Sequence, residues 1–95
     1  MPTLSARALK TALSSLPGWR GTGKAIKRQY TFPTFPDAIA FTTRLAFAAE
    51  AADHHPDVLI SYRKVTVTYS THSQGGVTRK DITGAKAADA AAGVL

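Results

Sequence analysis

Apolar residues recur every three or four positions in three stretches of the 95-residue chain, as they do along the buried side of an amphipathic helix. These stretches predict helices over residues 3–16, 34–52 and 78–92. The pair Pro17-Gly18 ends the first helix, because it breaks the helical pattern. Thr78 and Asp81 begin the third helix with the spacing of a capping box.

Apolar and polar residues alternate in the stretches between these helices, which is typical of half-buried strands. The alternation covers residues 25–32, 57–62 and 65–72, and a short strand at Trp19 would pair with the first of these. The last two stretches flank a tight turn and therefore predict an antiparallel hairpin. Arg28 falls on the apolar face of its strand, so we expect it at an edge or with its head in water.

Taken in order, these elements predict an α+β fold. It is a mostly antiparallel four-stranded sheet with three helices packed on one face, in the order α-β-β-α-β-β-α. Residues 1–95 would form a single domain, because a chain this short supports only one modest core. The middle helix carries more apolar side chains than one sheet face needs, so we expect another subunit to cover the surplus.

Composition narrows the classes of function. The chain has no cysteine, which excludes disulfides, thiolate metal sites and a cysteine nucleophile. No run approaches the roughly 20 apolar residues of a membrane span, and the N-terminus lacks the apolar core of a signal peptide. We therefore expect a cytoplasmic protein with no membrane partner.

Twelve basic residues outnumber six acidic ones and give a net charge of +6 at pH 7. Basic domains often bind nucleic acid or another anion. Here the cations are scattered and their densest clusters are pairs, so no direct nucleic-acid partner is expected. A generic basic binding module remains one alternative interpretation of the charge.

The three histidines of the chain lie at the two ends of the predicted hairpin. His54 and His55 precede its first strand and His72 ends its second, so antiparallel pairing should bring them together with neighbouring acids. Three interpretations compete. The histidines are surface or capping residues, which the dipole favours near a helix C-terminus; they bind a metal; or they catalyse proton transfer, for which an ordinary pKa near 6.5 suits imidazole.

Two other residues also have a structural and a functional interpretation. Trp19 follows directly after a helix end, where it would anchor the packing or line a pocket. Asp81 is the third residue of a capping box, a structural role that competes with any catalytic one. No nucleophile elbow, phosphate loop or dinucleotide fingerprint is present in the sequence.

Several runs of residues match the pattern of one known family. They are Glu50-x-x-Asp53-His54-His55-Pro56-Asp57, Tyr62-x-Lys64-Val65-x-Val67, Thr71-His72-x-x-Gly75-Gly76-x-Thr78-x-x-Asp81-Ile82, Leu16-Pro17-Gly18-Trp19, Ile26-x-Arg28-x-Tyr30-x-Phe32 and Phe41-x-x-Arg44. With these runs the chain resembles the pterin-4a-carbinolamine dehydratases from about residue 4 to residue 89. The paired histidines with Pro56, and Thr71-His72 at their spacing, are the most specific part.

The resemblance implies loss of water from a 4a-hydroxytetrahydropterin to give the quinonoid dihydropterin, without a metal or cofactor. It implies proton transfer at the hydroxyl by His54 and His72, while His55 holds and deprotonates the ring. It further implies a set of substrate-binding positions, which are Trp19, Glu50, Asp53, Pro56, Thr71 and Asp81. It also implies a homodimer or a homotetramer, which would cover the apolar surplus of the long helix.

The chain departs from the family pattern at two places near the histidines. Val58 stands where many members carry a tryptophan, which removes one aromatic wall of the expected pocket, and Arg63 replaces a frequent asparagine in the hairpin turn. Some relatives are non-catalytic and act as dimerisation cofactors of transcription factors or as assembly factors for the carbon-fixing carboxylase. Such a role is the alternative here, although the three histidines favour catalysis.

Overall fold

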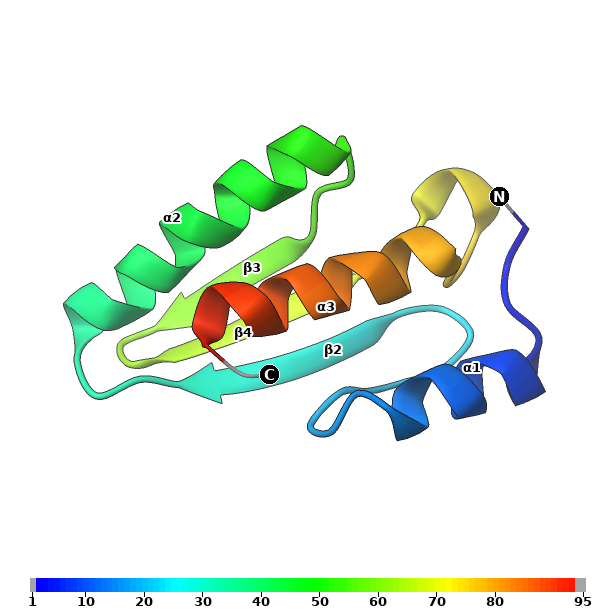
Figure 1. Cartoon of the computed structure of the whole chain (residues 1–95), viewed down its shortest axis with the longest axis horizontal. Coiled ribbons are helices and arrows are strands. Elements are labelled where there is room, and N and C mark those ends of the chain that lie inside the picture. The colour runs from blue at the N-terminus through cyan, green and yellow to red at the C-terminus, as the bar shows by residue number, and fades with distance from the viewer. Residues whose placement is uncertain (1, 94–95) are drawn as a thin grey trace.

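The protein, here a computed structural model that describes residues 2–93, has three α-helices and four strands in the predicted order (Figure 1). The helices are α1 (Ala6–Ser14), α2 (Phe35–Ala52) and α3 (Arg79–Ala92). The strands are β1 (Arg20–Gly21), β2 (Ile26–Thr31), β3 (Asp57–Ser61) and β4 (Lys64–Tyr69), and a 3-10 turn, η1 (His72–Gln74), follows β4. In these residues no helix is long and apolar enough to cross a membrane.

The four strands form one antiparallel sheet with the spatial order β1-β2-β4-β3. The predicted hairpin is β3–β4, in which Ser61 pairs with Lys64 across a two-residue turn. Tyr62 enters that turn with a positive φ of 55°. The predicted fold is confirmed, but β4 ends at Tyr69, three residues before His72, which starts η1 instead.

Each helix is preceded by a residue whose hydroxyl side chain caps its first turn. Ser5 caps α1, Thr34 caps α2, and Thr78 caps α3 as part of a complete capping box with Asp81. The first helix is shorter than residues 3–16, because the segment before Ser5 is extended and is tied to the segment before α3 by a backbone hydrogen bond from Leu4 to Val77.

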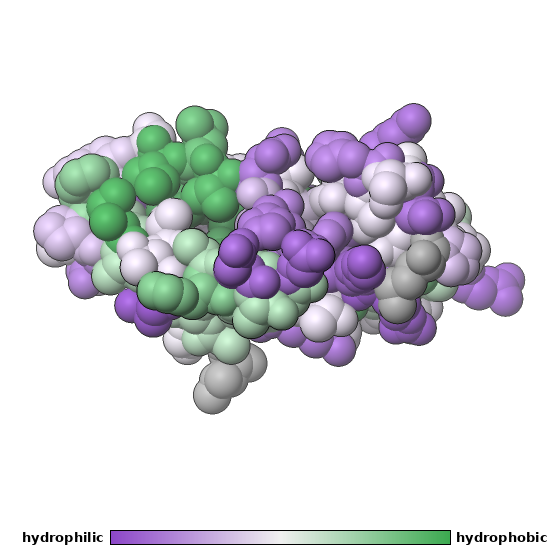
Figure 2. All heavy atoms as spheres, turned by 90° about the horizontal axis from the view of Figure 1, so that it is seen from above, coloured by the Kyte–Doolittle hydropathy of each residue, from purple (hydrophilic) through white to green (hydrophobic). Residues whose placement is uncertain are grey.

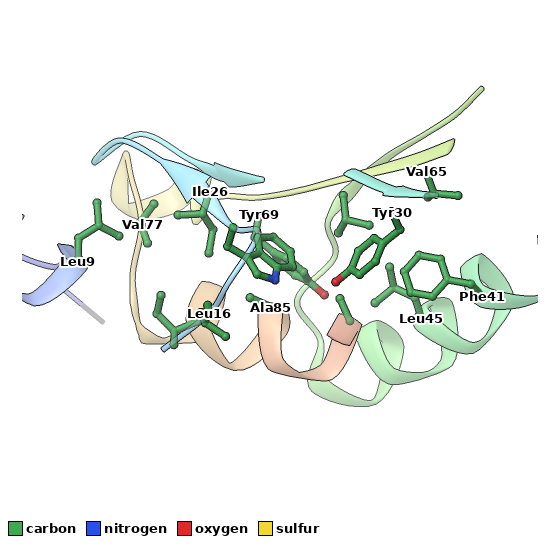
Figure 3. Packing of buried hydrophobic residues seen from close by; sticks show 14 of the residues in the cluster. Leu9, Leu16, Ile26, Tyr30, Phe41, Leu45, Val65, Tyr69, Val77 and Ala85 are labelled. Atoms are coloured by element: carbon green, nitrogen blue, oxygen red, sulfur yellow. The ribbon is translucent and has the colours of Figure 1, made fainter. Parts of the chain in front are cut away.

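The core lies between the helices and the sheet face that they cover (Figures 1 and 3). Alternate residues of the two central strands point into it, namely Ile26 and Tyr30 of β2 with Val65, Val67 and Tyr69 of β4. The helices contribute mainly Leu9, Phe41, Leu45, Ile82, Ala85 and Ala88. The intervening residues of β2, such as Lys27, are exposed on the opposite face.

A buried carboxylate of α3, that of Asp89, accepts hydrogen bonds from the core side of the sheet. It explains why Arg28 can lie on the apolar face of its strand. Oδ1 of Asp89 accepts hydrogen bonds from Arg28 Nη1 at 3.1 Å, Trp19 Nε1 at 3.0 Å and the Tyr30 hydroxyl at 2.5 Å. The Arg28 side chain is therefore 19% exposed and ion-paired. The expected edge position fits the register, because β1 pairs only with the first two residues of β2 and Arg28 lies just beyond its end. The expected solvated head was wrong, because the guanidinium is held by Asp89.

The expected apolar surplus is present on one half of the molecule. Among residues 2–93, the large apolar side chains that remain exposed are on α2, on β3 and in the hairpin turn: Phe35, Ile39, Phe47, Val58, Leu59 and Tyr62. Figure 2 looks down on α2 and shows hydrophobic residues gathered on the left, whereas the half that contains η1 and the start of α3 is mainly hydrophilic.

Candidate functional site

The turn after α2 sets the directions of the two adjacent histidines. Asp53 caps the helix in the left-handed conformation, with φ 50° and ψ 42°, and the backbone N–H of His54 still donates to the carbonyl of Ala49. The chain then reverses into β3. Because of this turn, His54 faces α3 whereas His55 folds back onto α2.

His54 forms a part-buried polar contact with α3. Its Nε2 lies 2.6 Å from Oδ1 of Asp81, and the two side chains are 14% and 0% exposed. An ionised carboxylate can only accept hydrogen bonds, so Nε2 carries the proton of this contact. Nδ1 is the ring nitrogen that lies outside this contact.

Asp81 is held in place by its second oxygen. Oδ2 accepts the backbone N–H of Thr78 at 2.8 Å and the hydroxyl of Thr71 at 2.8 Å. The Thr71 hydroxyl also lies 2.8 Å from that of Thr78, and since its own proton is directed to Asp81, Thr78 is the donor between them. The carboxylate that orients His54 is thus also part of the first turn of α3.

Tyr69 forms the wall against which the imidazole packs. Its ring is stacked on that of His54, with centroids 5.6 Å apart and planes 23° apart. Burial, and to a smaller extent the nearby charge of Asp81, raises the pKa of the Tyr69 hydroxyl to about 12, so it stays neutral at physiological pH. Gly84 of α3 lies so close to this ring that a Cβ atom at its position would come within 2.5 Å of it.

A hollow between α2 and α3 begins at these rings. His54 and Tyr69 border it together with alanines of α2 and with Arg79, Lys80 and Thr83 of α3. Most of its surface is apolar, with the imidazole among the few polar groups. Such a surface can pack against the face of a flat ring while the imidazole meets a polar atom at its edge.

His55 belongs to a different hollow. Its Nε2 lies 2.7 Å from Oε1 of Glu50, and both side chains are well exposed, at 55% and 80%. Pro56 and Val58 border the same hollow, which lies between α2 and β3. The two histidines therefore each have a carboxylate partner, one buried and one exposed.

The remaining predicted site residues lie at different depths. His72 and Asp53 are exposed, and neither side chain has a hydrogen bond or ion pair among residues 2–93. Within that range no three His, Asp or Glu side chains are arranged to hold a metal ion. Trp19 is 5% exposed in the core and reaches the site only through Tyr69, at a centroid distance of 6.4 Å.

The structure thus brings together His54, Asp81 and Thr71 by direct hydrogen bonds, and it pairs His55 with Glu50 separately. Sequence reasoning missed Tyr69 and Gly84 as parts of the site. The alternation of β4 predicted that Tyr69 is buried but not what it contacts. Gly84 had a usable signal, since a glycine within a helical pattern often has a packing reason.

An α+β framework in which a buried carboxylate contacts an imidazole beside a hollow defines the class: a small α+β protein with a histidine–carboxylate pair between two helices. The sequence model of the family described as pterin 4 alpha carbinolamine dehydratase matches residues 2–91. The chain belongs to this family.

Relatives from several bacteria support the assignment. A "putative pterin-4-alpha-carbinolamine dehydratase" of Paracoccus denitrificans is 47% identical over 94 residues, covering 97% of this chain and 88% of that protein. One with the same name from Nocardia farcinica is 51% identical over 79 residues, covering 83% of each chain.

Two solved structures share the fold. A transcriptional coactivator/pterin dehydratase from Brucella melitensis is 38% identical, with a TM-score of 0.90 over 94% of this chain and 97% of that one. A pterin dehydratase-like protein described as a RuBisCO assembly factor in the alpha-carboxysome is 20% identical, with a TM-score of 0.68 over 81% and 89% of the two chains. The second likeness concerns the fold alone.

Proposed function

We propose that this protein dehydrates a 4a-hydroxytetrahydropterin to the quinonoid dihydropterin by histidine acid–base catalysis. The observation that carries the proposal is the contact of part-buried His54 with the buried carboxylate of Asp81, in a chain that belongs to the dehydratase family. A carboxylate held this firmly keeps one imidazole nitrogen protonated and leaves the other free to exchange a proton.

The reaction needs one proton delivered and one removed. The 4a-hydroxyl leaves as water when an acid protonates it, and a ring N–H gives its proton to a base, so the carbon–oxygen bond breaks as a ring double bond forms. Protonated imidazole can serve as the acid and neutral imidazole as the base at neutral pH. No net change in the protein is required once protons have exchanged with water.

In this proposal Nδ1 of His54 exchanges the proton at the hydroxyl, because Nε2 is occupied by Asp81. His72, on the exposed turn η1, acts as its partner from the solvent side. His55 holds and deprotonates the pterin ring, and Glu50 fixes its tautomer through the 2.7 Å contact. We assign proton transfer to these three histidines.

The other assigned residues act around the histidines. Asp53 and Glu50 offer exposed carboxylates to the amino and amide groups of a pterin, and Pro56 shapes the hollow next to His55. Thr71 and Asp81 position His54. Trp19 contributes only behind Tyr69, as a support for the wall of the hollow.

The test uses the purified protein and chemically generated 4a-hydroxytetrahydropterin, with the disappearance of the hydroxy adduct followed by absorbance. The wild-type protein should dehydrate the substrate faster than buffer alone, and a chelator should leave its rate unchanged. His55→Ala should lower turnover at least tenfold, about 1.4 kcal/mol or more in the barrier. Lys10→Gln, an exposed change on α1, is the control. A wild-type rate no faster than buffer overturns the proposal.

We further propose that the chain acts as a single cytoplasmic domain in a homodimer or homotetramer. The exposed apolar residues of α2 and β3 support association, because a small domain gains stability when such a surface is covered. Analytical ultracentrifugation should find more than one chain per particle. Ile39→Asp on α2 should weaken the association, whereas Thr11→Asp on α1 should leave it intact.

A further inference from the structure

We propose that the groove between α1 and α3 is a binding site for a phosphate monoester. The groove has a volume of about 630 Å³, which lies within the roughly 300–1,000 Å³ of small-molecule sites. Arg7 of α1 and both Arg79 and Lys86 of α3 line it. These residues are separate from the pairs formed by His54 and His55.

The three cations that line the groove come from two helices. Arg79 and Lys86 are seven residues apart, two turns along one face of α3, which corresponds to about 10 Å at 1.5 Å per residue. Arg7 faces them from α1. All three are exposed, and none of them has an ion pair or side-chain hydrogen bond among residues 2–93. Their donors are therefore free for a ligand.

No acidic side chain compensates this charge. The sequence of α1 contains none, and the two acidic residues of α3, Asp81 and Asp89, are buried on its inner face and occupied by donors. The exposed acids lie elsewhere, on α2, in the turn after it and on β3: Asp37, Glu50, Asp53 and Asp57. The segregation gives the groove a positive potential that favours an anion.

The lining also indicates which anion fits. Arginine matches phosphate oxygens with paired donors, and Thr11 adds a hydroxyl at the rim. Ile82 and two alanines of α1 give an apolar floor for the organic part of the ligand. A nucleic acid carries one charge per about 1.7 Å of duplex, and three cations in one groove can neutralise only a few of these charges, so the groove suits a single phosphate better than a polyanion.

Arg79 lines both this groove and the hollow that begins at His54. The phosphate can therefore come from two sources, which are a side chain of the pterin itself or a separate phosphorylated metabolite. Only the first source rests on the proposed dehydratase function. The phosphate site itself does not.

Phenyl phosphate is the probe, and phenol is its uncharged counterpart. We expect calorimetry in phosphate-free buffer to detect phenyl phosphate but not phenol, and amide NMR shifts to fall on α1 and α3. Arg7→Gln and Arg79→Gln should each weaken binding at least tenfold. Lys27→Gln, which removes an exposed cation from the open face of the sheet, should change it less than twofold.

Equal binding of phenol, shifts confined to other elements, or an equal loss in Lys27→Gln overturns the proposal. Tighter binding of a 20-nucleotide single-stranded DNA that phenyl phosphate cannot displace overturns it in favour of a polyanion surface. Thermal melting of each variant shows that it is folded.

A second arm separates the sources. Dehydration is compared for a pterin with a side-chain phosphate and for the same pterin without it. A loss of kcat/KM in Arg79→Gln for the phosphorylated pterin alone assigns the phosphate to the substrate, whereas wild-type values of kcat/KM for both pterins assign the site to another metabolite. Absence of dehydration with both pterins would remove the proposed function and leave phenyl phosphate binding as the measure of the site.

Discussion

Nε2 of His54 donates to a carboxylate oxygen of Asp81 at 2.6 Å, and the other oxygen of that carboxylate accepts the backbone N–H that starts α3. One buried group therefore orients the imidazole and caps the helix. The two roles use different oxygens, so they do not compete.

Asp81→Asn should lower turnover at least tenfold, about 1.4 kcal/mol. The amide oxygen can still accept the N–H of Thr78, but its NH₂ group then faces His54 and favours the opposite ring tautomer. Initial rates of dehydration measure the loss. Asp37→Asn at the start of α2, far from the imidazole, is the matched control and should keep the wild-type rate. Equal rates for both variants would contradict the orienting role of Asp81.

Gly84→Ala should lower both stability and turnover. Its Cβ would lie 2.5 Å from the ring of Tyr69, which must move and disturb the stacking on His54. Overpacking of this kind costs about 1–3 kcal/mol, measurable as a lower free energy of unfolding in urea. Gly23→Ala is the control, because no atom lies within 4 Å of its added Cβ. A Gly84→Ala protein as stable and as active as Gly23→Ala would show that the contact relaxes freely.

Asp89→Ala should destabilise the fold while leaving the chemistry of the folded fraction unchanged. It leaves Arg28, Trp19 and the Tyr30 hydroxyl without their shared acceptor. Removing one partner of a buried pair costs about 3–5 kcal/mol, so the urea midpoint should fall sharply. Turnover per folded molecule, measured below that midpoint, should stay near the wild-type value. A large loss of turnover in fully folded protein would instead connect Asp89 to catalysis.

Alkaline pH should unfold the protein in part through Tyr69. Its folded pKa of about 12 lies above the ordinary 10.0, so the folded state favours the protonated phenol. The corresponding stability is complete below pH 10 and is lost as the pH rises from about 10 to about 12. Tyr69→Phe removes this proton and should flatten that part of the stability curve, as urea unfolding at several pH values will measure. An unchanged slope in Tyr69→Phe would contradict the assignment.

The sequence was sufficient to predict the fold because its periodicities are strong. The stretch 34–52 and the capping pair Thr78 and Asp81 place two helices within a residue or two of their observed bounds. The hairpin followed from two alternating runs and a short turn. These signals are local, and local signals survive in the fold when the core agrees with them.

The site was less predictable because it depends on contacts between distant segments. Pairing of the hairpin was expected to gather three imidazoles, but His72 leaves the strand for η1, and the left-handed turn at Asp53 sends His54 and His55 to different hollows. The burial of Asp89 could not be predicted from the sequence either. Its position in the helical pattern is clear, but its three donors come from β2 and from Trp19.

Because Asp81 belongs to the capping box of α3, local opening of the first turn of this helix should be enough to abolish the proposed catalysis. If the first turn of α3 frays, Thr78 and Asp81 separate and the imidazole loses its acceptor while the sheet remains intact. Amide hydrogen exchange at Asp81 would then report the working state of the site more directly than a global melting curve. On heating, dehydration activity should therefore be lost some degrees below the temperature at which the whole protein unfolds.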